Sequence, residues 1–134
     1  MDRKSKAASP ELIADPDEQA RREVANGFRQ FDAALEMVEQ HRAERRPFKL
    51  RLSIILTLHR FALEGISSFA GNFRPSTVEI GGSDHTPVGA HLVPGLVGEM
   101  CDYVNEHWGT ATPLHLAAYV MWRINWIHPF DDGR

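Results

Sequence analysis

The chain has 134 residues, 43% hydrophobic and 25% charged, which is the composition of one globular domain and not of a disordered protein. Its 15 Lys and Arg against 18 Asp and Glu leave a formal net charge of -3, which excludes binding to nucleic acid through a strongly basic surface. The sequence has a charged start, a single Cys101 and no apolar run near the roughly 18 residues that span a bilayer, so we expect a cytoplasmic protein without membrane segments.

The N-terminal part of the chain predicts one long helix. Residues 1–14 are polar and we expect a flexible lead-in, after which Asp15, Pro16 and Glu18 fit the N-cap, N1 and N3 positions of a helix. Apolar residues then recur every three or four positions to about residue 41: Ala20, Val24, Phe28, Phe31, Leu35 and Val38. Gly27 interrupts this stripe, which indicates either a bend or close packing. We expect a helical region over residues 15–46 and a core over residues 47–134, together one domain over residues 15–134.

The core region predicts three further helices and one hairpin. The first of these helices follows Phe48 and places His59 on its apolar face as a core histidine. Residues 77–80 alternate, two glycines and a serine turn the chain, and residues 84–86 can return as a second strand. A helix opens at Pro94, and Thr112 caps the last one. We expect that helix to have one apolar face: Leu114, Ala117, Ala118, Met121, Ile124 and Ile127. The fold class is therefore all-α with a small β-hairpin.

The end of the chain, Ile-His-Pro-Phe-Asp-Asp-Gly-Arg, carries the residues best suited to chemistry. A proline after His128 disfavours helical backbone at the histidine, which places its imidazole at the C-terminus of a helix or just past it. The stretch supplies a base near neutral pH, carboxylates for a hard cation, a glycine amide and a guanidinium that fits phosphate. Such a set suits transfer chemistry on a nucleotide phosphate, although these residue types on a surface turn are more commonly just solvated.

These residues resemble the signature loop of the Fic family, whose pattern is HPF, any residue, Asp or Glu, then GNGR. The preceding segment is similar as well, with a helix, the turn AGNFR, a hairpin with GGS, and two helices that lead into IHPF. The sequence NGFRQFD in the first helix also resembles the N-terminal region of a bacterial subset of the family. The resemblance covers about residues 17–134.

The resemblance implies a Fic-like helical domain that transfers AMP from ATP to a Tyr, Thr or Ser hydroxyl of a target protein. It makes His128 the catalytic base, Asp132 the Mg²⁺ ligand, and Gly133 and Arg134 the phosphate-binding residues. The hairpin matches the flap that pairs with the target, formed by Thr77, Val78, Glu79, Ile80, Gly81 and Gly82. Core contacts are an equally good interpretation of Val78 and Ile80. The family's inhibitory motif is absent, since the single candidate Glu64 has Arg60 four residues before it where the family has Ser or Thr. Control by a separate inhibitor protein or by another mechanism stays open.

The sequence departs from the family pattern after Gly133. Arg134 follows directly, where the family has Asn and Gly before the arginine, and the helix expected next is missing from these 134 residues. Loss of one preorganised donor costs about 3 kcal/mol in a transition state, so we expect this chain by itself to be weakly active or inactive. Two other functions remain open: a catalytically dead binding module that holds a partner through its flap, and a related enzyme that transfers another phosphate-containing group or removes AMP.

Overall fold

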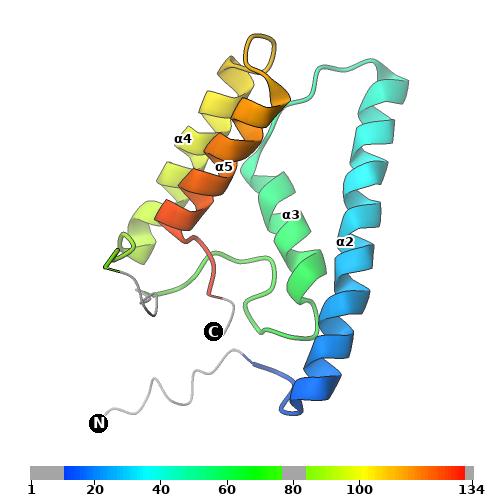
Figure 1. Cartoon of the computed structure of the whole chain (residues 1–134), viewed down its shortest axis with the longest axis vertical. Coiled ribbons are helices and arrows are strands. Elements are labelled where there is room, and N and C mark those ends of the chain that lie inside the picture. Colours follow the sequence, from blue (N-terminus) through cyan, green and yellow to red (C-terminus); the bar gives the residue numbers. More distant parts are fainter. Residues whose placement is uncertain (1–10, 77–83, 132–134) are drawn as a thin grey trace. The chain divides into compact units, whose positions relative to one another are not determined.

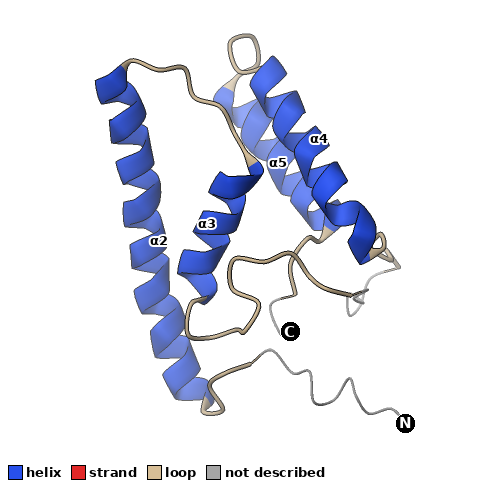
Figure 2. Cartoon of the chain, turned by 180° about the vertical axis from the view of Figure 1, so that it is seen from behind, coloured by secondary structure: helices blue, strands red, loops and turns tan. Residues whose placement is uncertain are grey.

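The computed structural model describes residues 11–76 and 84–131, which form four α-helices and a short 3-10 helix (Figure 1). The elements are α2 (Pro16–Glu44), α3 (Leu52–Leu63), η1 (Ala90–Leu92), α4 (Val93–Glu106) and α5 (Pro113–Ile127). In this part of the chain the helices are joined by loops without a named strand (Figure 2), which confirms the all-α class. No helix of the described part is both long and apolar enough to cross a membrane.

The expected hairpin cannot be followed in the structure. Residues 77–83, which include the first strand and the turn, lie outside the described residues. Residues 84–86 are described and form no strand there, while the residues expected to pair with them lie outside the described part, so the hairpin stays a prediction. The side chain of His85 hydrogen-bonds to the Trp126 carbonyl near the end of α5.

The described residues divide into two compact units. The α2 unit comprises residues 11–46 and 56–72, and the α4–α5 unit comprises residues 47–55, 73–76 and 84–131. The first residues of α3 therefore belong to the α4–α5 unit and its remainder to the α2 unit. Within the α2 unit, Glu11 pairs with Ser67 and the Leu12 N–H donates to the Ile66 carbonyl at 2.8 Å, so part of the expected lead-in is held by backbone bonds.

The ends of α2 follow their capping signals. The Asp15 side chain accepts a bond from the Asp17 N–H at 3.4 Å, and proline opens the first turn, as the sequence predicts. At the other end Arg45 adopts left-handed backbone with φ 56° and donates its N–H to the Arg42 carbonyl at 3.2 Å. The helix therefore ends at Glu44, before Pro47 is reached.

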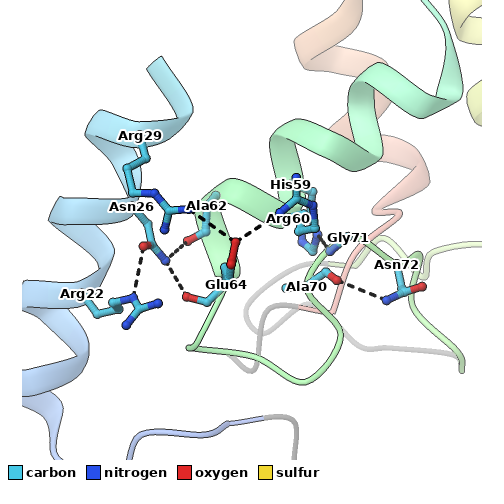
Figure 3. Close-up of polar contacts among 10 residues, drawn as sticks. All are labelled: Arg22, Asn26, Arg29, His59, Arg60, Ala62, Glu64, Ala70, Gly71 and Asn72. Atoms are coloured by element: carbon cyan, nitrogen blue, oxygen red, sulfur yellow. Dashed lines mark hydrogen bonds and ion pairs between the residues drawn. The ribbon is translucent and has the colours of Figure 1, made fainter. Parts of the chain in front are cut away.

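Helix α2 turns a polar side towards the rest of its unit. Asn26 is buried and its Nδ2 donates to the Ala62 carbonyl at 3.1 Å and to the Glu64 carbonyl at 2.8 Å (Figure 3). The Glu64 carboxylate also pairs with Arg29 at 3.5 Å and Arg60 at 3.2 Å. The two bonds from Asn26 satisfy carbonyls at the end of α3 that have no donor within the helix. The apolar stripe predicted for α2 stays between 49% and 69% exposed at Val24, Phe28, Phe31, Leu35 and Val38.

Gly27 provides a direct test of the helix interior. A Cβ placed on it meets nothing within 4 Å, and α2 runs without a break from Pro16 to Glu44, so the close-packing interpretation is wrong. Replacing Gly27 with alanine is expected to raise the free energy of unfolding by about 1 kcal/mol, because alanine loses less backbone entropy in a helix. Urea unfolding followed by circular dichroism measures the change.

The matched control for Gly27→Ala is Gly71→Ala. Gly71 has φ +80° and its added Cβ would lie 3.0 Å from Arg60 Cβ, so this variant is expected to lose stability. A Gly27→Ala variant that is no more stable than the parent chain would contradict the prediction.

The core of the α4–α5 unit lies between these two helices, which run side by side (Figure 1). It consists of Val93, Val97, Met100, Cys101 and Ile127, with partly buried residues from residues 50–55 packed against it. Asn105 attaches that segment, because its side chain accepts from the Leu50 N–H at 2.7 Å and donates to the Leu50 carbonyl at 2.9 Å.

Helix α5 starts as predicted but buries a different face. The Thr112 hydroxyl accepts from the His115 N–H at 3.1 Å, which confirms the N-cap. The expected apolar face is only partly correct: Ile127 is buried, but Leu114 is 81% and Met121 67% exposed, while Leu116 is buried instead. Because α5 is apolar on nearly all sides, its periodicity does not select the packed side.

Candidate active site at the C-terminal end of helix α5

His128 lies at the end of α5 in an unusual backbone conformation. Helix α5 ends at Ile127, and His128 is the C-cap residue with φ 51° and ψ 64°, its N–H donating to the Ile124 carbonyl at 2.7 Å. Left-handed backbone costs an L-residue other than glycine about 1–2 kcal/mol, and the following Pro129 further restricts residue 128. The position at the helix end agrees with the sequence prediction. The strain shows that neighbouring groups must hold the histidine in place.

His128 is partly buried, and its hydrogen bonds within residues 11–76 and 84–131 are made by its backbone N–H and carbonyl. Pro129, the next residue, is buried, and Phe130 stacks on Phe73 with ring centroids 5.6 Å apart. The turn is thus anchored at the proline and at the phenylalanine that follows it.

Arg74 is the group that holds this turn. Its side chain is 2% exposed, with Nε donating to the His128 carbonyl at 2.6 Å and Nη2 to the Ile127 carbonyl at 3.2 Å. Its backbone N–H donates to the Pro129 carbonyl at 2.8 Å. The remaining guanidinium bonds reach the Ser76 carbonyl at 3.0 Å and the Val88 carbonyl. One residue therefore contacts three consecutive carbonyls of the turn that carries the candidate base.

The charge of Arg74 is balanced by dipoles. Each acceptor is a backbone carbonyl, and within the described ranges no carboxylate forms an ion pair with it. Burial lowers the pKa of Arg74 from its ordinary value. The guanidinium lies at the C-terminal end of α5, where unpaired carbonyls and the helix dipole favour a cation. The turn AGNFR and the sequence HPF, which are 54 residues apart at Arg74 and His128, are therefore in direct contact.

His85 reaches the same helix end from another segment. Its Nε2 lies 2.7 Å from the Trp126 carbonyl, so the ring nitrogen donates, and the two rings have centroids 5.4 Å apart. Because His85 comes shortly after residues 77–83, this bond anchors the chain that leaves the expected flap. Sequence reasoning missed the roles of both Arg74 and His85. The arginine could have been found as the only cation of the AGNFR turn, whereas nothing in the pattern distinguishes His85.

Several predicted site residues lie outside the described part. The residues that are not described include Asp132, Gly133 and Arg134, and the flap residues Thr77, Val78, Glu79, Ile80, Gly81 and Gly82. Their roles stay predictions. Asp131 is the last described residue and is partly buried. No three His, Cys, Asp or Glu side chains gather into a metal-binding group among the residues that the structure describes.

Two other residues singled out by sequence have structural surroundings. Cys101 is buried in the α4–α5 core, where desolvation, and then the charge of Asp102, raise the pKa of its thiol and oppose formation of the reactive thiolate. His59 accepts a bond from the Gly71 N–H at its Nδ1, at 3.0 Å (Figure 3), which ties α3 to the AGNFR turn within the α2 unit. Neither contributes to the site at the end of α5.

Known proteins resemble this chain over part of its length. The model of the Fic/DOC family matches residues 49–133. Among curated proteins, those called protein adenylyltransferase Fic from Drosophila persimilis and from Drosophila pseudoobscura pseudoobscura are each 36% identical over 89 residues. The match covers 63% of this chain and 17% of each relative, so the chain spans about a sixth of their length.

A solved structure shows the same fold. The crystal structure of a Fic family protein from Desulfovibrio desulfuricans G20 matches with a TM-score of 0.70 and 22% sequence identity. The match covers 90% of this chain and 34% of that one. The helical arrangement of the described residues is therefore one that a longer natural protein also uses.

Proposed function

This chain belongs to the Fic/DOC family, and from that premise we propose that it transfers AMP from ATP to a Tyr, Thr or Ser hydroxyl of a target protein. The observation that carries the proposal is the histidine of the HPF sequence, held at the end of α5 with its carbonyl bonded to Arg74. The name protein adenylyltransferase, given to relatives 36% identical over 89 residues, supports the same activity.

His128 acts as the general base in the proposed reaction. As the target hydroxyl oxygen forms a bond to the α-phosphorus of ATP, the hydroxyl proton passes to the imidazole. The bond from the α-phosphorus to the bridging oxygen breaks, and pyrophosphate leaves with that oxygen. An imidazole suits this step because its pKa lies near neutral pH, where it can accept a proton and later release it.

The residues that follow His128 would bind the phosphates. Mg²⁺ in phosphoryl-transfer sites is usually held by one or two carboxylates together with substrate phosphate oxygens. A single carboxylate such as that of Asp132 would therefore suit this ion. A group of three protein ligands, which the described residues do not form, is not needed. The ion would withdraw charge from the phosphates when it is bound. Gly133 would donate its N–H to a phosphate oxygen, and Arg134 would pair with phosphate through its guanidinium. The absence of Asn and Gly between these two residues is expected to weaken transfer.

The flap would hold the target protein. We assign target binding to residues 77–82, which would pair with an extended target segment by adding a strand. The bond from His85 to the Trp126 carbonyl supports this assignment, because it fixes the chain just after the flap to the helix that presents His128. We also propose control by a separate inhibitor protein, because Arg60 stands four residues before Glu64, where the family's inhibitory motif has Ser or Thr.

The test follows label from α-³²P-ATP with Mg²⁺ into protein, and the mass of the modified product. We expect the mass of an added adenylate, and a shift of the His128 NMR signals when Mg·ATP is added to the chain. Added phosphate or uridylate would identify a different transferase. A chain that transfers no label and shows no shift of His128 with Mg·ATP would contradict the proposal, and binding of a partner without nucleotide would then favour a binding module.

A further inference from the structure

We propose that Arg74 is the positioning residue of the site, which fixes the backbone of His128 so that its imidazole faces the substrate; the role in catalysis rests on the proposed function. The starting observation is that His128 occupies left-handed backbone before a proline. The backbone preference of His128 itself opposes this conformation, and so does the restriction that Pro129 puts on the residue before it. A base with a loosely held backbone would lose the geometry that proton transfer requires.

The contacts of Arg74 act on the bonds that set the direction of the His128 side chain. Rotation about ψ of Ile127 and ψ of His128 would move their carbonyls away from Nη2 at 3.2 Å and Nε at 2.6 Å. The backbone bond from Arg74 to the Pro129 carbonyl, at 2.8 Å, fixes the following peptide. With three consecutive carbonyls held, the Cα–Cβ bond of His128 has one direction relative to the end of α5.

A guanidinium is required for this role because its donors point in fixed directions. Nε and Nη2 bind neighbouring carbonyls of the turn, while Nη1 and Nη2 also reach the Ser76 and Val88 carbonyls. A lysine ammonium keeps the positive charge but presents a single nitrogen, so it cannot span these acceptors. The substitution Arg74→Lys therefore separates positioning from simple charge.

The contacts also join the turn to both sides of the flap. The Ser76 carbonyl immediately precedes residues 77–83, and the Val88 carbonyl follows them. Arg74 thus ties the two segments that flank the expected target-binding hairpin to the backbone of the candidate base. The same side chain therefore contacts the backbone of the candidate base and the described residues Ser76 and Val88.

The first experiment uses the unmodified chain. With ¹⁵N and ¹³C labelling, we expect a scalar coupling across the hydrogen bond from Arg74 Nε to the His128 carbonyl carbon. We also expect slow exchange of the Nε proton. This measurement needs neither activity nor a variant. A rapidly exchanging Nε proton without the coupling would overturn the proposal.

The second experiment compares Arg74→Lys with Arg123→Lys. The control residue Arg123 lies on α5, the helix that ends before His128, and its guanidinium lies over Trp122 at 5.3 Å and Trp126 at 5.2 Å. In Arg74→Lys we expect the carbonyl and Cα shifts of His128 to leave their left-handed values. We expect kcat for AMP transfer to fall about 100-fold, the cost of a misplaced reacting group, with KM for ATP unchanged. Arg123→Lys is expected to change neither His128 nor kcat.

The outcomes separate this inference from the proposed function. A folded Arg74→Lys chain with unchanged His128 shifts would overturn the inference whatever the activity. If Arg74→Lys does not fold, the coupling in the unmodified chain decides. If the unmodified chain transfers no AMP and its His128 ignores Mg·ATP, the proposed function fails. The coupling and the shifts would then still show whether Arg74 sets the conformation of residue 128.

Discussion

Replacing His128 with asparagine is expected to lower kcat for AMP transfer about 1,000-fold, since a general base contributes about 10²- to 10⁴-fold. Asparagine is chosen because it tolerates left-handed backbone, as at φ 51°, but cannot act as a base. The turn should therefore keep its conformation while the proton acceptor is lost. The KM for ATP is expected to stay near that of the parent chain, because the phosphates are assigned to other residues. Initial rates of label transfer from α-³²P-ATP measure both constants.

The control for this substitution is His115→Asn. His115 lies in the first turn of α5, where its Nε2 is 2.8 Å from the Tyr103 hydroxyl, and it has no part in the proposed reaction. Its replacement is expected to leave kcat unchanged. Label transfer that survives His128→Asn at the parental rate would remove the base assignment, and with it the mechanism proposed for the end of α5.

Replacing Arg74 with methionine is expected to lower the free energy of unfolding by about 4 kcal/mol. Methionine fills much of the same volume but donates no hydrogen bond. The carbonyls of Ser76, Val88, Ile127 and His128 would each lose a donor, and an unsatisfied buried carbonyl costs about 1–3 kcal/mol. Part of the summed cost is offset because a buried cation no longer has to be desolvated. Urea unfolding followed by circular dichroism gives the value.

Arg123→Met is the matched control for stability. Arg123 also lies near the end of α5, but its guanidinium contacts the faces of Trp122 and Trp126, both of them partly exposed. We expect its loss to cost less than about 1 kcal/mol, the usual size of an exposed cation–π contact. If the two substitutions changed stability equally, the bonds from Arg74 to the turn would not be a principal source of stability for the α4–α5 unit.

The helices with strong end signals could be predicted from the sequence. Asp15 and Thr112 act as N-caps where the pattern placed them, because a side-chain oxygen next to free N–H groups is a local feature. The packed sides of the helices could not be predicted in the same way. The apolar stripe of α2 is exposed while Asn26 is buried, and Met121 is exposed where a core position was expected. Which side of a helix is covered depends on neighbours that come from distant parts of the chain.

The candidate site was predicted in part. The His-Pro pair placed His128 at a helix end because a proline acts on the residue before it, which is again a local effect. The supporting contacts connect residues far apart in sequence, Arg74 to His128 and His85 to Trp126. No periodicity or spacing shows such contacts, since their donors and acceptors are backbone carbonyls and side chains that meet only after folding.

The sequence by itself determined that this chain is helical, where α2 and α5 begin, and that the HPF sequence follows the last helix. These properties depend on caps, proline and spacing, which act over a few residues. Only the tertiary structure decided that His128 takes left-handed backbone and that a buried arginine, bonded to carbonyls instead of a carboxylate, holds it there. The physical reason is that this conformation is unfavourable locally and is maintained by bonds from a residue 54 positions away.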